Sequence, residues 1–326
     1  MTPVRSMADS PVRIGISACL LGQEVRFDGG HKRDTFLTEV LGPHVEWVPV
    51  CPEVEVGMGT PRETLRLVRP NRSSNELRMI TTRTAVDYTD RMNSWAARRV
   101  EELASEDLSG YVLKKDSPSC GMERVKVYPS TGMPDRSGRG LFATVLKNRF
   151  GSLPVEEEGR LTDPRLRENF IERVFAYRRL TDLFAGNWNT GALVCFHTSH
   201  KMALLAHSPT AYNELGRLVA GAKAVGKREL RKCYERLFME TLTLMATTRK
   251  HTNVLAHMAG HLNRRLDDGS KRELRQSIDE YRRGLVPLVV PLTLIRHHVR
   301  VHTVEYLAGQ TYLEPHPREL MLRNHV

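Results

Sequence analysis

The sequence predicts an α/β N-terminal domain built on a parallel sheet, followed by an all-α C-terminal bundle. In the first half, short apolar runs that end at Gly or Pro alternate with segments that have one apolar helix face, which is typical of buried parallel strands and crossover helices. In the second half, apolar residues recur at helical spacing throughout. At 326 residues the chain is long enough for two domains with separate cores. We expect a disordered tail over 1–11, the α/β domain over 12–158 and the all-α domain over 159–326.

The first half is expected to alternate strands and helices in a regular order. Apolar runs predict strands at 12–17, 45–50, 65–68, 77–81, 110–114, 125–128 and 153–155. One-sided apolar patterns predict helices at 34–41, 89–107 and 141–150. Residues 129–140 are rich in Gly and Ser and are expected to form a polar loop, a candidate lid. This order predicts a parallel, Rossmann-like sheet with helices on both faces.

The second half carries helix start signals. Asp163-Pro164 places a capping residue before a proline at the first helical position, and Ser208-Pro209 repeats the arrangement. Gly226 precedes a third helical pattern. We therefore expect an all-α bundle beyond residue 159.

The net charge of +11 is unevenly placed. Residues 1–159 hold 22 Lys and Arg against 22 Asp and Glu, whereas residues 160–326 hold 27 against 16, with 11 of the 13 histidines. A basic helical domain commonly binds a polyanion. A solvated surface with surplus arginine would give the same count.

The sequence also indicates in which cellular compartment the protein is expected. No apolar stretch approaches the roughly 18 residues of a membrane span, and the polar N-terminus holds no apolar signal core. We expect a cytoplasmic protein with no membrane partner. The five cysteines therefore predict metal ligands or catalytic groups rather than disulfides, because cytosolic thiols stay reduced.

Three of these cysteines follow expected strands. Cys19, Cys51 and Cys120 each stand just past an apolar run, and the carboxyl ends of parallel strands converge on one crevice. Three thiolates leave one coordination position open, on zinc or on one iron of an iron–sulfur cluster, and position alone does not separate the two. The alternative is three small buried apolar residues. Cys195 and Cys233 lie in helical patterns and are expected in the core.

Several polar residues stand beside these cysteines. Asp28, in an Asp-Gly-Gly sequence, is a candidate acid or base, or else forms a turn. Glu53 is a candidate general acid or base, or else forms an ion pair with Arg62. Ser117 and Ser119 offer hydroxyl donors beside a metal or a developing anion, or else serve as turn residues.

Four motifs in this half resemble the thiouracil desulfidase family. They read ISACLLG over 16–22, VRFDGGHK over 25–32, PVCPE over 49–53, and LK followed by SPSCG within 113–121. The resemblance covers nearly all of residues 12–158. The second half resembles a helical domain that is often fused to the first. The two-domain form is similar to the desulfidases that act on 4-thiouridine in tRNA.

The resemblance implies a cofactor and a reaction. Cys19, Cys51 and Cys120 would hold a [4Fe–4S] cluster, leaving one open iron to bind the sulfur of a 4-thio-pyrimidine. Water would replace that sulfur at C4 with no net redox change. Glu53 would position or deprotonate the water or protonate the ring. Ser117, the catalytic candidate, or Ser119 would bind the pyrimidine or the developing anion. Asp28 is a further catalytic candidate. Candidate substrate-binding residues in the same motifs are Ser119, Lys114 and Arg26.

The basic half is expected to bind the tRNA. Arg and Lys clusters are spread over several of its expected helices, which would make a phosphate-binding surface if the faces converge. The pairs His197/His200 and His257/His261 have helical spacing. A second metal site is one interpretation of these pairs, and satisfied polar contacts or RNA phosphate contacts are the commoner one.

Two other functions fit the same residues. The first is a desulfidase of free thiouracil or another small thio-compound, with the basic domain binding a different partner. The second is a non-enzymatic iron–sulfur stress sensor that binds nucleic acid. The sequence does not predict the oligomeric state.

Overall fold

The computed structural model describes residues 11–70, 76–129 and 132–325. The chain divides into two compact units, one ending at Thr162 and the other beginning at Asp163, and each is described by itself. The expected tail, apart from residue 11, lies outside the described residues.

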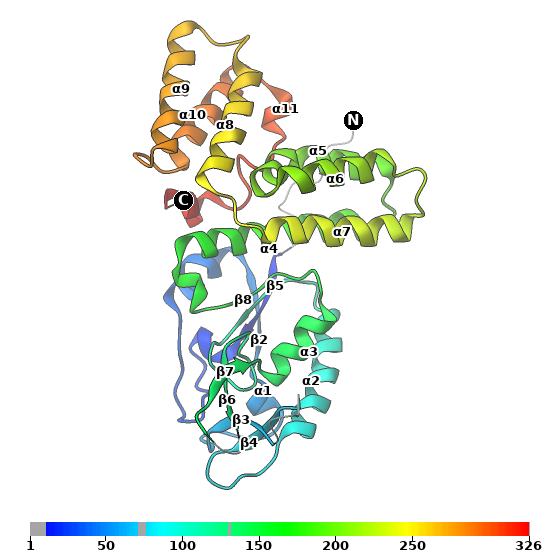
Figure 1. Ribbon diagram of the computed structural model, residues 1–326, viewed down its shortest axis with the longest axis vertical. Helices are drawn as coiled ribbons and strands as arrows, with labels where there is room; N and C mark the ends of the chain where they lie inside the picture. Colours follow the sequence, from blue (N-terminus) through cyan, green and yellow to red (C-terminus); the bar gives the residue numbers. More distant parts are fainter. Residues whose placement is uncertain (1–10, 71–75, 130–131, 326) are drawn as a thin grey trace. The chain divides into compact units, whose positions relative to one another are not determined.

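A parallel sheet forms the centre of the first unit. It contains β1 (Arg13–Ser17), β2 (Glu46–Val50), β5 (Leu108–Leu113) and β8 (Val155–Glu157), in the order β2-β1-β5-β8 (Figure 1). All three pairings are parallel, and every residue of β5 is buried. The predicted parallel sheet is confirmed, although its last strand starts at Val155 rather than at residue 153.

The other four strands form a second, mixed sheet. It contains β3 (Leu65–Arg69), β4 (Arg78–Thr81), β6 (Val125–Pro129) and β7 (Asp135–Gly138), in the order β4-β3-β6-β7. β3 pairs with β6 in parallel, and the two outer pairings are antiparallel. The prediction of a plain loop over 129–140 is wrong at residues 135–138, where polar β7 hydrogen-bonds to β6 as an edge strand.

The first unit also contains three α-helices and a π-helical segment among its described residues. They are α1 (Pro52–Glu55), α2 (Thr89–Ala104), α3 (Leu141–Arg149) and the π-helical segment at Phe36–Leu41. Helix α3 packs against β5 of the parallel sheet. The ring of Phe142 lies 5.5 Å from Trp95 and 5.9 Å from Tyr111, measured between centroids. Gly15 on β1 admits this packing, because a Cβ there would stand 2.2 Å from the Tyr111 ring. The helix expected over 89–107 ends earlier, at Ala104.

The second unit is helical in its described residues, as predicted. Its helices are α4 (Pro164–Phe184), α5 (Thr190–His207), α6 (Pro209–Ala220), α7 (Lys227–Thr243), α8 (Thr248–Leu262), α9 (Asp268–Arg282), α10 (Val289–Val301) and α11 (Glu305–Ala308). The predicted caps are confirmed: the Asp163 carboxylate accepts from the Arg165 and Leu166 backbone N–H groups, and the Ser208 hydroxyl accepts from the Ala211 N–H.

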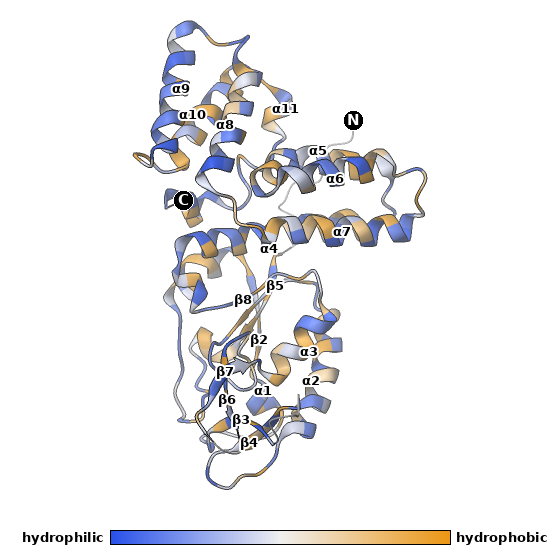
Figure 2. Cartoon of the chain, viewed as in Figure 1, coloured by the Kyte–Doolittle hydropathy of each residue, from blue (hydrophilic) through white to orange (hydrophobic). Residues whose placement is uncertain are grey.

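Two apolar clusters hold this unit together. One joins α4, α5, α6 and α7 around Tyr234 and Phe238, and the other joins α8, α9 and α10 to the C-terminal part of α5. Helix α9 buries four residues along one side. Most of its other residues face outward and are hydrophilic, as Figure 2 shows. No helix in the described part of the chain is long and apolar enough to cross a membrane.

Candidate functional site

A cavity of about 330 Å³ lies at the carboxyl ends of β1, β2 and β5, and Cys19, Cys51 and Cys120 all line it. Cys19 stands in the 3-10 turn after β1, Cys51 directly follows β2, and Cys120 lies in the loop after β5. Because neighbouring parallel strands end at one edge, thiols far apart in sequence meet there. The structure thus brings the three cysteines together.

The three thiols are largely shielded from solvent. Cys19 and Cys120 are buried, Cys51 is half-buried, and all three are free thiols. Burial raises the pKa of Cys19 to about 11 and raises the pKa of Cys51 and of Cys120 as well. A thiol that stays protonated at neutral pH is a poor nucleophile. Without a bound cation these groups are therefore unsuited to attack a substrate.

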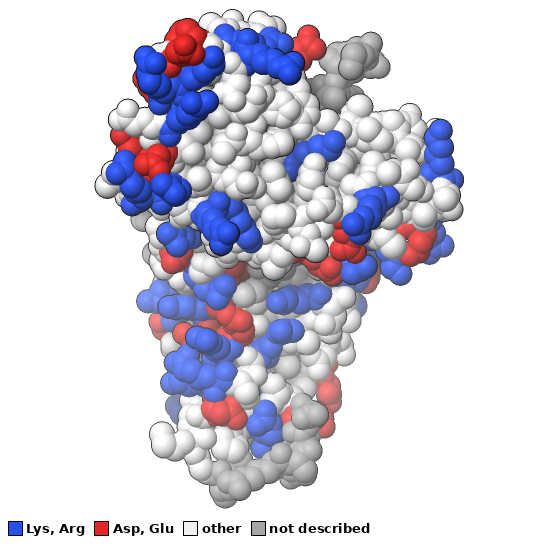
Figure 3. Space-filling model, turned by 45° about the horizontal axis from the view of Figure 1, so that its top comes forward, with Lys and Arg blue, Asp and Glu red and all other residues white. Residues whose placement is uncertain are grey.

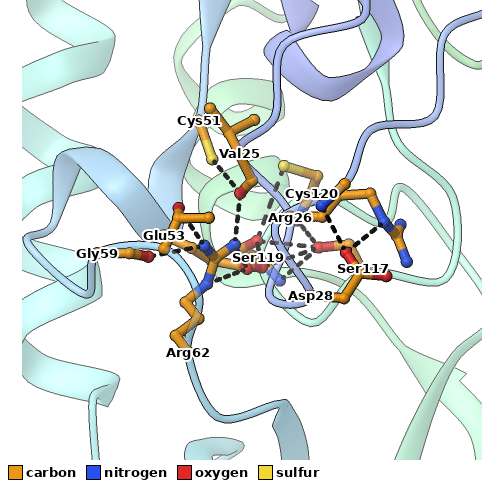
Figure 4. Close-up of polar contacts among 12 residues, drawn as sticks. Val25, Arg26, Asp28, Cys51, Glu53, Gly59, Arg62, Ser117, Ser119 and Cys120 are labelled. Carbon is orange, nitrogen blue, oxygen red and sulfur yellow. Dashed lines mark hydrogen bonds and ion pairs between the residues drawn. The ribbon is translucent and has the colours of Figure 1, made fainter.

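Glu53 on α1 faces both serines of the cysteine loop. Its Oε1 accepts from the Ser119 hydroxyl at 2.7 Å and from the Ser117 hydroxyl at 3.5 Å (Figure 4). Its Oε2 accepts from Arg62 Nε at 3.0 Å. The two interpretations of Glu53 are therefore compatible, because one oxygen pairs with arginine while the other faces the cavity lining.

Arg62 has a larger part in the site than the sequence indicated. Its side chain is 5% exposed. Besides Glu53, it donates to the Val25 carbonyl at 2.9 Å and to the Gly59 carbonyl at 3.0 Å. A planar guanidinium with fixed donors suits such a fork. Arg62 thus fixes Glu53 relative to two loops, and only the possible ion pair signalled it in the sequence.

The two serines have different surroundings. Ser117 Oγ accepts from the Cys120 backbone N–H at 3.1 Å and from the Ser119 N–H at 3.3 Å, so it stabilises the cysteine loop as a turn residue. Ser119 is fully buried, and its hydroxyl also lies 3.7 Å from Cys120 Sγ. Gly140 allows α3 to approach this loop, because a Cβ there would stand 2.3 Å from the Ser119 carbonyl oxygen.

Lys114 and Arg26 also line the cavity. Lys114 Nζ lies 2.5 Å from Glu158 Oε1, and Glu158 Oε2 accepts from the Lys115 backbone N–H at 2.8 Å. The Arg26 side chain is 20% exposed, and its buried Nε has no hydrogen-bond partner among the described residues. Sequence reasoning did not identify Glu158, yet Glu156, Glu157 and Glu158 are all buried, and the first two pair with β5.

Asp28 is not among the residues that line the cavity. Its Oδ1 accepts from the Gly30 backbone N–H at 3.1 Å and lies 3.5 Å from Arg26 Nε. The Gly30 hydrogen bond and the Arg26 charge lower the pKa of this exposed carboxyl. This geometry matches the turn interpretation, and the catalytic role of Asp28 stays a prediction.

The other sequence candidates are not among the residues that line this cavity. Cys195 is exposed and Cys233 half-buried, so the prediction that both are core residues is wrong; the helices turn these positions outward. His200 is buried, and its Nε2 accepts from Arg179 at 3.2 Å. Among the residues that the structure describes, no group of three or more His, Cys, Asp or Glu side chains is placed to hold a single metal ion.

Two family models match the chain. A 2-thiouracil desulfurase model matches residues 14–158, which contain the cavity, and a model of a protein family of unknown function, DUF1722, matches residues 201–317.

Individual proteins resemble the chain over about half its length. The uncharacterized protein YbgA of Escherichia coli (strain K12) is 34% identical over 163 residues, which are 49% of this chain and 95% of YbgA. The uncharacterized protein YbbK of Bacillus subtilis (strain 168) is 29% identical over 151 residues, 45% of this chain and 97% of YbbK. A solved structure of the [4Fe-4S]-dependent thiouracil desulfidase TudS shares 28% identity over 46% of this chain and 93% of its own, with a TM-score of 0.38.

The chain therefore belongs to the family of YbgA, and it joins a 2-thiouracil desulfurase domain to a DUF1722 domain. Its first unit is the enzymatic part, a desulfidase domain.

Proposed function

We propose that this enzyme removes sulfur from 4-thiouridine in tRNA by hydrolysis, giving uridine and sulfide, and that it depends on a [4Fe–4S] cluster. One observation carries the proposal: three reduced thiols and the hydrogen-bonded pair Glu53–Ser119 line the same cavity. Cytoplasmic tRNA is the substrate that best suits a desulfidase domain fused to a basic helical one.

The residues present fit a three-thiolate cluster. Cys19, Cys51 and Cys120 form no disulfides, and their raised pKa values mean that binding of iron would displace protons from them. Arg26 and Lys114 supply positive charge at the same cavity. When bound, the cluster would supply an iron without a protein ligand, a Lewis acid with affinity for the substrate sulfur.

The protein residues would handle water and protons. Glu53 Oε1 is the basic atom in the cavity wall, and it would take a proton from the water that adds at C4. Arg62 holds the carboxylate by its other oxygen, so that Oε1 keeps one direction. The Ser119 hydroxyl, 2.7 Å from Oε1, would pass a proton toward the ring or hydrogen-bond to it. Sulfur would leave with a proton as hydrosulfide, and no electrons are gained or lost.

The second unit would bind the tRNA body. It is a helical unit in a half of the chain that carries the whole net positive charge. On the face drawn in Figure 3, Lys and Arg side chains gather in several separate patches, with Asp and Glu beside some of them. Remote phosphate contacts would offset the cost of extruding the target base from its stack.

Free 4-thiouracil is the second candidate substrate. The cavity volume of about 330 Å³ is at the low end for small-molecule sites, which suits a single pyrimidine ring. In this case the helical unit would serve another partner.

The deciding experiment uses the reconstituted full-length protein under strict anaerobic conditions. It is mixed with tRNA containing 4-thiouridine, and separately with free 4-thiouracil, while thiouridine absorbance and released sulfide are followed. We expect loss of absorbance and release of sulfide with tRNA, and neither with Cys19→Ala.

Two outcomes would contradict the proposal. Turnover of free 4-thiouracil without turnover of tRNA would reassign the substrate to the small molecule. A protein that holds its cluster but releases no sulfide from either compound would instead support an iron–sulfur sensor.

A further inference from the structure

The helical unit contains a second cavity, of about 670 Å³, between α5 and α6. Lys201 of α5, Arg217 of α6 and Lys223 just beyond α6 line it, and no Asp or Glu side chain among the described residues does. A concave wall that carries charge of one sign concentrates the field of its charges, because the protein excludes solvent on one side. The cavity is therefore an attractive site for an anion.

The three positively charged side chains of this cavity have no partner in the described part of the chain. None of Lys201, Arg217 and Lys223 has an ion pair or a side-chain hydrogen bond within the described part of the chain. On neighbouring α7, by contrast, arginines have acidic partners: Arg236 pairs with Glu240 at 3.2 Å, and Arg231 approaches Glu235. Unpaired cations around a cavity keep their full charge for a ligand.

His197 adds a neutral polar group to the cavity wall. The residue is 4% exposed, and its Nδ1 lies 3.3 Å from the Tyr234 hydroxyl. Burial and the nearby Lys201 charge lower the pKa of His197 to about 4, so the ring is neutral at neutral pH. If Tyr234 donates to Nδ1, Nε2 carries the proton and is a donor. Gly216 leaves space beside it, because a Cβ there would stand 4.0 Å from Nε2.

We propose that the α5–α6 cavity binds a nucleotide through its phosphate, with Lys201, Arg217 and Lys223 contacting the phosphate oxygens. Tyr212 lines the same cavity and offers a ring on which a base can stack. A volume of this size accommodates one nucleotide. The nucleotide is either part of the bound tRNA, in which case the inference rests on the proposed function, or a free nucleotide.

The test measures binding by the full-length protein separately from catalysis. In vitro transcribed tRNA, which lacks 4-thiouridine, is titrated over a range of salt concentrations, and uridine monophosphate is titrated in a second arm. The variants are Lys201→Gln with Arg217→Gln, and Gly216→Leu to fill the cavity without changing charge. The matched control is Arg236→Gln, which removes a surface cation already paired with Glu240.

We expect the double variant to weaken ligand binding by about tenfold or more, and to reduce the slope of log K against log salt for tRNA by about 1 to 2. Gly216→Leu should weaken binding, and Arg236→Gln should match the wild type. Loss confined to tRNA identifies an RNA nucleotide as the ligand, loss confined to uridine monophosphate identifies a free nucleotide, and loss for both shows that the cavity binds either.

Wild-type affinity of both cavity variants for tRNA and for uridine monophosphate would overturn the proposal. Because the transcript carries no thiouridine, failure of desulfidation leaves this result unaffected, and the two proposals fail separately.

Discussion

The Ser119 hydroxyl oxygen lies 2.7 Å from Glu53 Oε1, although 66 residues separate the two in the chain. Arg62 holds the other oxygen of the same carboxylate. One carboxylate is therefore fixed from one side and presented to a hydroxyl on the other, in the wall of the cavity that the three cysteines line.

Replacing the carboxylate should remove catalysis without removing the cofactor. Glu53→Gln keeps the shape of the side chain but cannot accept a proton, so we expect sulfide release to fall by about 100- to 10,000-fold. The visible spectrum of the reconstituted protein should be unchanged, because Glu53 is not one of the proposed ligands. The control is Glu39→Gln, which alters an exposed glutamate paired with Arg33. Activity within about twofold of the wild type for Glu53→Gln would exclude it as the base.

Arg62 should act on the rate through the position of Glu53. Arg62→Gln loses the fork that contacts Glu53 and two backbone carbonyls, so we expect kcat to fall by about tenfold or more while KM changes little. Arg62→Lys should recover only part of this loss, because an ammonium cannot reproduce the fork. Steady-state kinetics on both variants test this, and a rise in KM with unchanged kcat would argue against a positioning role.

Substitution of the two serines should have different effects on the rate and on the iron content. Ser119→Ala removes the short contact with Glu53, and we expect the rate to fall by about tenfold with full cofactor retention. Ser117→Ala removes the acceptor for two backbone N–H groups of the cysteine loop, so it should mainly lower the iron content. Iron and sulfide analysis beside kinetics separates the two. Identical effects of both substitutions would contradict this division of roles.

Cofactor binding should depend on three cysteines and not on the other two. Cys19→Ala, Cys51→Ala and Cys120→Ala should each lose most of the iron and the visible absorption after anaerobic reconstitution. Cys195→Ser and Cys233→Ser are matched controls, because these thiols are exposed and half-buried and neither lines the cavity. Iron retention in any of the three alanine variants equal to that of the controls would remove that cysteine from the ligand set.

The helical unit should lose stability as pH rises above the ordinary histidine range. His207 is buried, with Nδ1 2.6 Å from the Leu244 carbonyl and Nε2 3.4 Å from Glu172. Burial opposes the charged form, but the Glu172 charge prevails and raises the pKa of His207 above 6.5. The stabilisation is therefore fully present below pH 6.5 and is lost as pH rises through the raised pKa, at about 1.4 kcal/mol per pH unit in that interval.

Thermal unfolding of the wild type and of His207→Gln at a series of pH values tests this expectation. Between pH 6.5 and the alkaline end of the series, the Tm of the wild type should fall by more than the Tm of the variant. Equal losses in the two proteins would show that His207 is not protonated in the folded unit.

Local patterns in the sequence determined the two-part architecture and the three thiols. Cys19, Cys51 and Cys120 were predicted to converge because each follows an apolar strand, and strand ends are readable from the residues beside them. The Asp163 and Ser208 caps were readable for the same reason, since each cap bonds only to its own first helical turn. The proposal of a [4Fe–4S] cluster rests on the resemblance of whole motifs rather than on spacing.

Only the tertiary structure decided the partners of these residues. Strand register places Glu158 against Lys114, although 44 residues separate them in the chain. Loop packing makes Arg62 the partner of Glu53, where an exposed carboxylate would bind water. The second sheet and the cationic cavity of Lys201, Arg217 and Lys223 likewise depend on segments that meet only after folding. Periodicity and capping are local and can be read along the chain, whereas hydrogen bonds and charge clusters between distant segments are set by how the elements pack.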